Sequence, residues 1–248
     1  MTFLLALLMQ VGPFVSPGAS QGIPQPPAQG RRKQARQAEA PRLPPPPVST
    51  RLQDCLDSAE AGPADTIEAA EAWLAQAKGT AQVEPGQCLG AAHGRRGEWG
   101  EAETAYLAAR DAAATGERGL RAKLGGMAGN AALAGAAPER ALAVLEQAQA
   151  DAQAAGDIKL SGEIAIDRAR ALVALKREDE AARLLVEART SSADNPLAWL
   201  LSATLSRRQG KLAAAQAQIA TAAHLAPTDP EIGLEAGVIA VLAGSDEA

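Results

Sequence analysis

The sequence predicts an all-α fold built from antiparallel helix pairs that stack one on the next. Apolar residues recur at helical spacing, and no run alternates as a half-buried strand would. Hydrophobic residues make up 47% of the 248 residues but aromatic residues only 2%, so Ala and Leu, both strong helix formers, must fill the interior. Small residues also recur at long, nearly regular intervals, which indicates repeated units that bury their apolar faces by stacking.

Residues 1–20 have the pattern of a secretory signal peptide. An apolar stretch from Phe3 to Val15 precedes small residues, which predicts cleavage near Ala19 or Ser20 and a periplasmic or exported protein. No Lys or Arg stands before the apolar stretch, so an uncleaved inner-membrane anchor is the alternative. The apolar core is shorter than the ~20 residues that span a bilayer, which favours cleavage.

Residues 21–50 are rich in Pro and predict a disordered linker. The linker is basic, with five cations against the single acid Glu39: Arg31, Arg32, Lys33, Arg36 and Arg42. Residues 31–42 could contact an anionic membrane weakly, although a solvated linker is the simpler interpretation. Residues 51–248 carry 19 basic and 28 acidic residues, which argues against nucleic acid as a partner.

The stretch 195–227 contains one complete helix-turn-helix unit. Asn195-Pro196 opens it, Gly210 divides it, and Pro227 closes it. Apolar residues at helical spacing lie on both sides of the Gly: Leu197, Leu200, Leu201 and Leu205 before it, and Leu212, Ile219 and Ala222 after it. Two antiparallel helices are predicted.

Numbered from Pro196, this unit has small or turn residues at fixed positions. Trp199 is at position 4, Ala203 at 8, Gly210 at 15, Ala215 at 20, Ile219 at 24, Ala222 at 27 and Pro227 at 32. This pattern resembles the tetratricopeptide repeat (TPR). The resemblance implies a right-handed superhelical solenoid that binds a protein or peptide partner. Ser202 and Ser206 depart from the family pattern, which usually has Leu and Tyr there.

The same register recurs in the residues before this unit. We expect a degenerate repeat 51–82, repeats 83–121, 122–161, 162–195 and 196–229, and a half repeat 230–248, all within a solenoid spanning 51–248. Positions 8, 20 and 27 are small in each full repeat: Gly90, Ala102 and Ala109; Gly129, Ala141 and Ala148; Ala169, Ala181 and Ala188; Ala203, Ala215 and Ala222. About six extra residues fall near 150–157. Unrelated Ala-rich helices in a bundle are the alternative.

Cys55 and Cys88 are the only cysteines and fall on the first helices of consecutive predicted repeats. In an exported chain an even number of cysteines favours a disulfide. A bridge closing a loop of this length would stabilise by roughly 3–4 kcal/mol on the chain-entropy estimate. Two buried thiols are the alternative.

No set of residues in the sequence suggests catalysis. His93 and His224 are far from each other and from the cysteines in the register, and a metal site needs three or four ligands. No nucleophile triad or phosphate-binding Gly loop stands out. We therefore expect no enzyme activity, no cofactor and no metal, with an unrecognised site in the groove as the alternative.

The TPR resemblance implies a concave groove lined by positions 2, 5, 9, 12 and 13 of the first helices. At those positions the sequence has Arg95, Asn130, Arg170, Arg207 and Arg208. Guanidinium groups pair with carboxylates, so this set could hold a peptide. The alternative is that these arginines pair with the chain's own Asp and Glu residues.

Residues 230–248 contain only the first helix of a repeat, and its apolar residues spread around most of its surface. They are Ile232, Leu234, Val238, Ile239, Val241 and Leu242, and they predict self-association or contact with a partner. The sequence as a whole favours an exported, non-enzymatic adaptor of the bacterial envelope. A membrane-anchored accessory module of envelope biogenesis is the second hypothesis.

Overall fold

A computed structural model describes residues 49–246 of the chain, with side chains to residue 244. All regular structure in this range is helical, which confirms the all-α prediction. The predicted signal peptide and residues 21–48 of the predicted linker lie outside it. The linker was expected to run to residue 50, but Ser49 already caps the first helix: its Oγ accepts a hydrogen bond from the Leu52 N–H at 3.1 Å.

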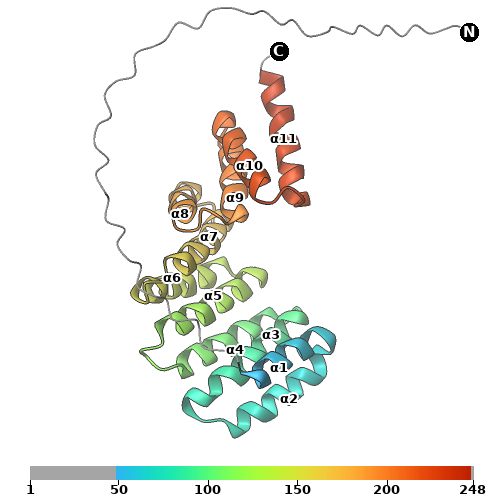
Figure 1. Ribbon diagram of the computed structural model, residues 1–248, viewed down its shortest axis with the longest axis vertical. Helices are drawn as coiled ribbons and strands as arrows, with labels where there is room; N and C mark the ends of the chain where they lie inside the picture. The colour runs from blue at the N-terminus through green and yellow to red at the C-terminus, as the bar shows by residue number, and fades with distance from the viewer. Residues whose placement is uncertain (1–48, 247–248) are drawn as a thin grey trace, which may run out of the picture. The chain divides into compact units, whose positions relative to one another are not determined.

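Neighbouring helices along the chain pack against one another and form a stack of pairs (Figure 1). The pairs are α1 (Thr50–Ala61) with α2 (Pro63–Gln76), α3 (Val83–Arg95) with α4 (Trp99–Ala112), α5 (Arg118–Ala134) with α6 (Pro138–Ala154), α7 (Ile158–Ala174) with α8 (Glu178–Ser191), and α9 (Pro196–Arg208) with α10 (Leu212–Leu225). A short 3-10 helix, η1 (Gly79–Gln82), precedes α3, and α11 (Pro230–Asp246) follows the last pair.

Each of the four pairs from α3 to α10 turns through one residue in the left-handed region. These residues, all at position 15 of the predicted register, are Gly97 (φ 74°), Ala136 (φ 56°), Lys176 (φ 61°) and Gly210 (φ 72°). The N–H of the next residue bonds the carbonyl five residues earlier, as from Lys211 to Ser206 at 2.8 Å. These bonds satisfy carbonyls left open at the helix end. The turn geometry therefore recurs even where the sequence lacks Gly.

Small residues lie where the two helices of a pair meet. The alanines at positions 20 and 27 of the four repeats are at most 1% exposed. Position 8 faces the bulky residue at position 24: a Cβ on Gly90 would lie 2.7 Å from the Tyr106 ring, and a Cβ on Gly129 would lie 2.4 Å from Leu145. A glycine at position 8 thus allows a contact between the two helices that a larger residue would block.

The middle of the stack is built from longer helices. α5, α6 and α7 have 17 residues each, whereas α8 and α10 have 14. The extra residues expected near 150–157 fall into the last turn of α6 and the loop before α7. Asp151 in that turn accepts hydrogen bonds from Arg110 at 3.0 Å and Arg118 at 3.3 Å, so the added turn fastens α6 to α4 and α5.

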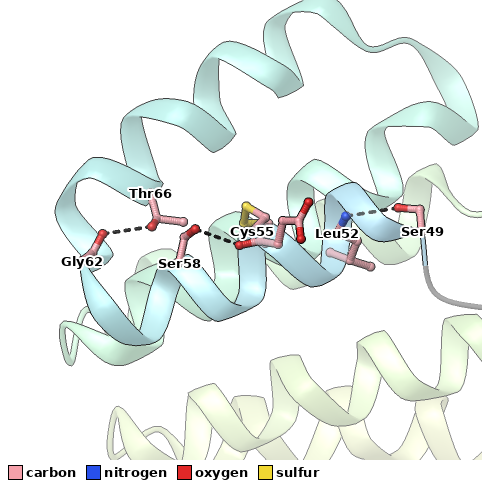
Figure 2. The surroundings of a disulfide bond; sticks show 8 residues. Ser49, Leu52, Cys55, Ser58, Gly62 and Thr66 are labelled. Carbon is pink, nitrogen blue, oxygen red and sulfur yellow. Dashed lines mark hydrogen bonds between the residues drawn. A yellow bond between two sulfur atoms is a disulfide. The ribbon is translucent and has the colours of Figure 1, made fainter.

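The first pair is held to the rest by a disulfide. Cys55 on α1 and Cys88 on α3 are bonded, with their Cα atoms 6.0 Å apart, which confirms the expected bridge between two first helices (Figure 2). Cys88 is fully buried and packs with Leu52 and Ala70. The connection between α1 and α2 is only Gly62, whose φ of −151° differs from the left-handed turns of the later pairs.

The last helix, α11, packs on α9 and α10 through part of its apolar surface. Ile232 and Ile239 are 2% and 1% exposed and lie in one cluster with Leu200 and Ile219. The prediction that all six apolar residues of this helix form an external surface is therefore wrong for these two, because they complete the core of the last pair. Leu234 and Val241 are each 73% exposed.

Candidate binding pocket

An apolar pocket of about 160 Å³ opens between α7, α8 and α9. Its walls are mostly aliphatic, with two arginines and one threonine among them: Ala169, Arg170, Val173, Leu185, Leu201, Thr204, Leu205 and Arg208. The pocket forms because α7 and α9 are first helices of adjacent pairs, and the position-24 residue of α8, Leu185, fills the space behind them. Two of the five residues expected in the groove, Arg170 and Arg208, thus lie at one pocket.

Arg170 belongs to a polar network that joins two first helices. Its Nη1 donates to Asp167 Oδ1 at 3.0 Å and to Asn130 Oδ1 at 3.2 Å, and Asn130 Nδ2 donates to Asp167 Oδ2 at 2.7 Å. Asn130 on α5 is therefore fixed against α7 by both of its amide atoms. The side chain of Arg170 remains 45% exposed, so it is oriented by the network and still reachable from solvent.

Asp167 is the acid of this network, and its pKa is raised above the usual value for an aspartate. Burial raises the pKa of its carboxyl group, while the hydrogen bonds from Asn130 and Arg170 act in the opposite direction. Its side chain is only 17% exposed, so loss of water outweighs the two donors. The network therefore holds a carboxylate that is ionised less readily than one on the surface.

Like Arg170, the other predicted groove arginines each pair with a carboxylate of the chain. Arg207 donates to Glu235 on α11 through Nε at 2.7 Å and Nη2 at 3.2 Å. Arg208 pairs with Glu178 at the start of α8, and Arg95 pairs with Glu60 on α1. Each arginine thus links neighbouring pairs of the stack, as the alternative interpretation of the sequence expected. The geometry brings Asn130 and Arg170 together but leaves Arg95 far along the stack.

The uncharged wall residues of the pocket were not predicted as site residues from the sequence. Val173 and Thr204 stand at positions 12 and 9 of their repeats, which are groove positions in the same register that identified Arg170 and Arg208. The predicted groove residues are all Arg or Asn, so Val173 and Thr204 are not among them. The repeat register could therefore have predicted Val173 and Thr204. Leu185 and Leu201 could not be distinguished from ordinary core residues by their sequence positions.

The two histidines lie on different helices, His93 in the last turn of α3 and His224 in the last turn of α10. His93 Nδ1 lies 2.7 Å from Glu98 Oε2, across the turn that joins α3 to α4. That hydrogen bond, with a second from Arg96, lowers the pKa of the Glu98 carboxyl. Within residues 49–246 no group of three His, Cys, Asp or Glu side chains is arranged to hold a metal ion. None of the described helices is long and apolar enough to cross a bilayer.

Two solved structures resemble this arrangement of helices. The crystal structure of BtubC (BKLC) from P. vanneervenii aligns with a TM-score of 0.61 and 16% identity, covering 79% of this chain and 85% of that one. The MamA RS-1 ArsTM double mutant aligns with a TM-score of 0.56 and 14% identity, covering 72% of this chain and 96% of that one.

No family model matches the chain, and no curated protein matches it. At 14–16% identity the two structural matches establish the fold and no more. In its fold the chain is a TPR-like helical repeat protein.

Proposed function

We propose that this protein is a non-enzymatic scaffold of the bacterial envelope that binds a segment of a partner protein at the pocket between α7 and α9. The observation that carries the proposal is the apolar pocket with two partly exposed arginine side chains, Arg170 and Arg208, at its walls. TPR-like stacks commonly serve protein interaction, and the first helices supply the walls here.

The size and chemistry of the pocket suggest what the segment contains. An apolar cavity of about 150 Å³ can hold a benzene ring, so a pocket of about 160 Å³ has room for one apolar side chain. Arg170 uses Nη1, and Arg208 uses Nη2, for their bonds within the described part of the chain. Their other N–H groups can donate to a carboxylate. We therefore expect the bound segment to have an apolar residue next to an acidic residue or next to its own C-terminal carboxylate.

Export is supported by the disulfide. Disulfides persist in oxidising compartments and are rare where glutathione keeps thiols reduced. The Cys55–Cys88 bond accordingly fits the periplasmic location that residues 1–20 predict. N-terminal sequencing of the protein purified from the envelope distinguishes a cleaved signal near Ala19 or Ser20 from a retained anchor.

The experiment is capture from an envelope fraction with the full chain, followed by binding measurements with a peptide from the captured protein. The double variant Arg170→Glu/Arg208→Glu is expected to weaken binding at least about tenfold, since two charge-assisted hydrogen bonds are lost and two repulsions are added. A matched control, Lys159→Glu/Lys211→Glu, makes the same charge change at exposed positions outside the pocket. Equal affinity of wild type and the pocket variant would refute the proposed site.

A further inference from the structure

A second cleft, of about 610 Å³, lies between α1 and α2. It is lined by Arg51, Asp54, Cys55, Ser58, Ala61, Gly62, Asp65, Thr66, Ala69 and Trp73. The single-residue connection at Gly62 leads directly from one helix to the next. Both helices pack against α3, and they meet each other less extensively than the helices of later pairs do.

Several residues that line the cleft are fixed by a disulfide or by hydrogen bonds. The disulfide fixes Cys55 of α1 to α3, and Thr66 of α2 is 4% exposed with its hydroxyl donating to the Gly62 carbonyl at 2.9 Å (Figure 2). The Ser58 hydroxyl is likewise bonded to the Asp54 carbonyl at 2.7 Å. These bonds hold the Cys55, Ser58 and Thr66 side chains in place.

The walls of the cleft are acidic. Asp54 on α1 and Asp65 on α2 are both exposed, and within the described residues neither carboxylate has a hydrogen-bond or ion-pair partner. Elsewhere in the stack, acids such as Glu178 and Glu235 form ion pairs with arginines. Residues 50–77 as a whole contain six acidic residues and one arginine. The electrostatic character of the cleft therefore favours a cation.

One guanidinium of the chain already lies at the wall of the cleft. The guanidinium carbon of Arg51 lies 4.0 Å from the centroid of the Trp73 ring, a distance typical of a cation–π contact. Arg51 therefore stacks on the Trp73 ring, which lines the cleft. Arg51 is the chain's own example of the group that this aromatic wall accepts.

We propose that the cleft between α1 and α2 binds an arginine-containing segment of a partner protein. Its guanidinium lies between Asp54 and Asp65, where it can donate to a carboxylate from each helix. Arginine suits this site better than lysine because its planar fork can donate to two carboxylates at once. The site is separate from the α7–α9 pocket, and it prefers a positively charged group where the pocket prefers a negatively charged one.

The test is a titration of the full chain with the peptide Ac-Ala-Arg-Ala-Ala-Arg-Ala-NH2, followed by two-dimensional NMR of backbone amides and of the tryptophan indole N–H groups. Shifts are expected on α1 and α2 and at the Trp73 indole, with those of Trp99 and Trp199 unchanged. The same peptide with glutamine in place of arginine should leave the spectrum unaltered, and the lysine peptide should bind more weakly.

Asp54→Asn/Asp65→Asn is expected to weaken binding of the arginine peptide about tenfold or more, because two charge-assisted hydrogen bonds become neutral ones. Both residues are exposed, so the variant should fold, and its circular dichroism spectrum verifies this. The matched control Glu101→Gln/Asp179→Asn removes the same charge at exposed positions of α4 and α8.

Three outcomes would overturn the proposal: equal binding by wild type and the cleft variant, an equal loss in the control variant, or peptide shifts located around the α7–α9 pocket. Failure here leaves the proposed function standing, because that function is tested by Arg170 and Arg208 with a different ligand. Failure of the pocket experiment likewise leaves this cleft untouched.

Discussion

Gly129 on α5 and Leu145 on α6 are in such close contact that a Cβ on the glycine would lie 2.4 Å from the leucine side chain. Leu145 is fully buried and cannot move aside without disturbing the core. Gly129→Ala is therefore expected to lower the free energy of unfolding by about 1–2 kcal/mol, because overpacking costs more than the gain in helix propensity. Urea denaturation of the variant and the wild type measures this difference in unfolding free energy.

The control for this prediction is Gly100→Ala on α4, where an added Cβ meets no atom within 4 Å. There the same substitution should raise the free energy of unfolding by about 0.5–1 kcal/mol, since only the propensity gain remains. If Gly129→Ala also stabilised the protein, the close contact between α5 and α6 would be incorrect.

Ala136 and Lys176 adopt left-handed backbone angles that disfavour any residue with a Cβ. Ala136→Gly and Lys176→Gly are each expected to stabilise the protein by about 0.5–1 kcal/mol, because relief of left-handed strain exceeds the entropy that glycine adds to the unfolded chain. Gly210→Ala should have the opposite sign. Denaturation midpoints of the three variants test the turn geometry, and a loss of stability in both glycine variants would contradict it.

Reduction of the Cys55–Cys88 bond should act locally. The chain-entropy estimate for this loop is roughly 3–4 kcal/mol, and the bond holds α1 to α3. In the Cys55→Ala/Cys88→Ala variant we expect faster amide hydrogen exchange in α1 and α2, with α7 to α10 unchanged. Mass measurement after alkylation of the unreduced wild type checks the bond itself: two alkylated thiols would exclude it.

Asp167 should make stability depend on pH. Its pKa is raised in the folded chain, so the folded protein holds this proton more tightly than the unfolded chain does. The contribution is present in full below the unfolded pKa, near 3.8, and is lost as pH rises through the folded value. Relative to Asp167→Asn, the wild type should therefore lose unfolding free energy across that window and then stay level. A pH-independent difference would contradict the raised pKa.

The exposed apolar residues of α11 still predict self-association. Leu234 and Val241 are both 73% exposed, so Leu234→Lys/Val241→Lys should abolish any dimer without affecting the core. Sedimentation of both proteins over a range of concentrations measures it. A wild type that stays monomeric at the highest concentration would refute the prediction.

The sequence predicted the fold well because its strongest signals are local. Gly210 marks a turn by its own conformational freedom, and small residues such as Ala203 and Ala222 mark where helices meet. Lys176 could not be recognised as a turn residue, since the neighbouring helices impose its backbone angles. The repeat boundaries themselves remain predictions, with α5 and α7 each starting four residues ahead of the proposed repeat start.

The candidate site was predictable only in part, because its groups come from different repeats. The register placed Arg170 and Arg208 on first helices, but their partners Asn130 and Glu178 lie 40 and 30 residues away in sequence. Whether a groove arginine faces solvent or a carboxylate depends on how adjacent pairs pack. That packing is a property of the three-dimensional stack.

The disulfide gives the stack unequal ends. α1 is joined to α3 by a covalent bond, whereas α11 is joined to α9 and α10 by two buried isoleucines and the Arg207–Glu235 ion pair. In a linear array each pair is stabilised mainly by its neighbours, so opening spreads from the weaker side. We expect α11 and α10 to open first and the α1–α3 region last, which gives unfolding of this protein a direction along the chain.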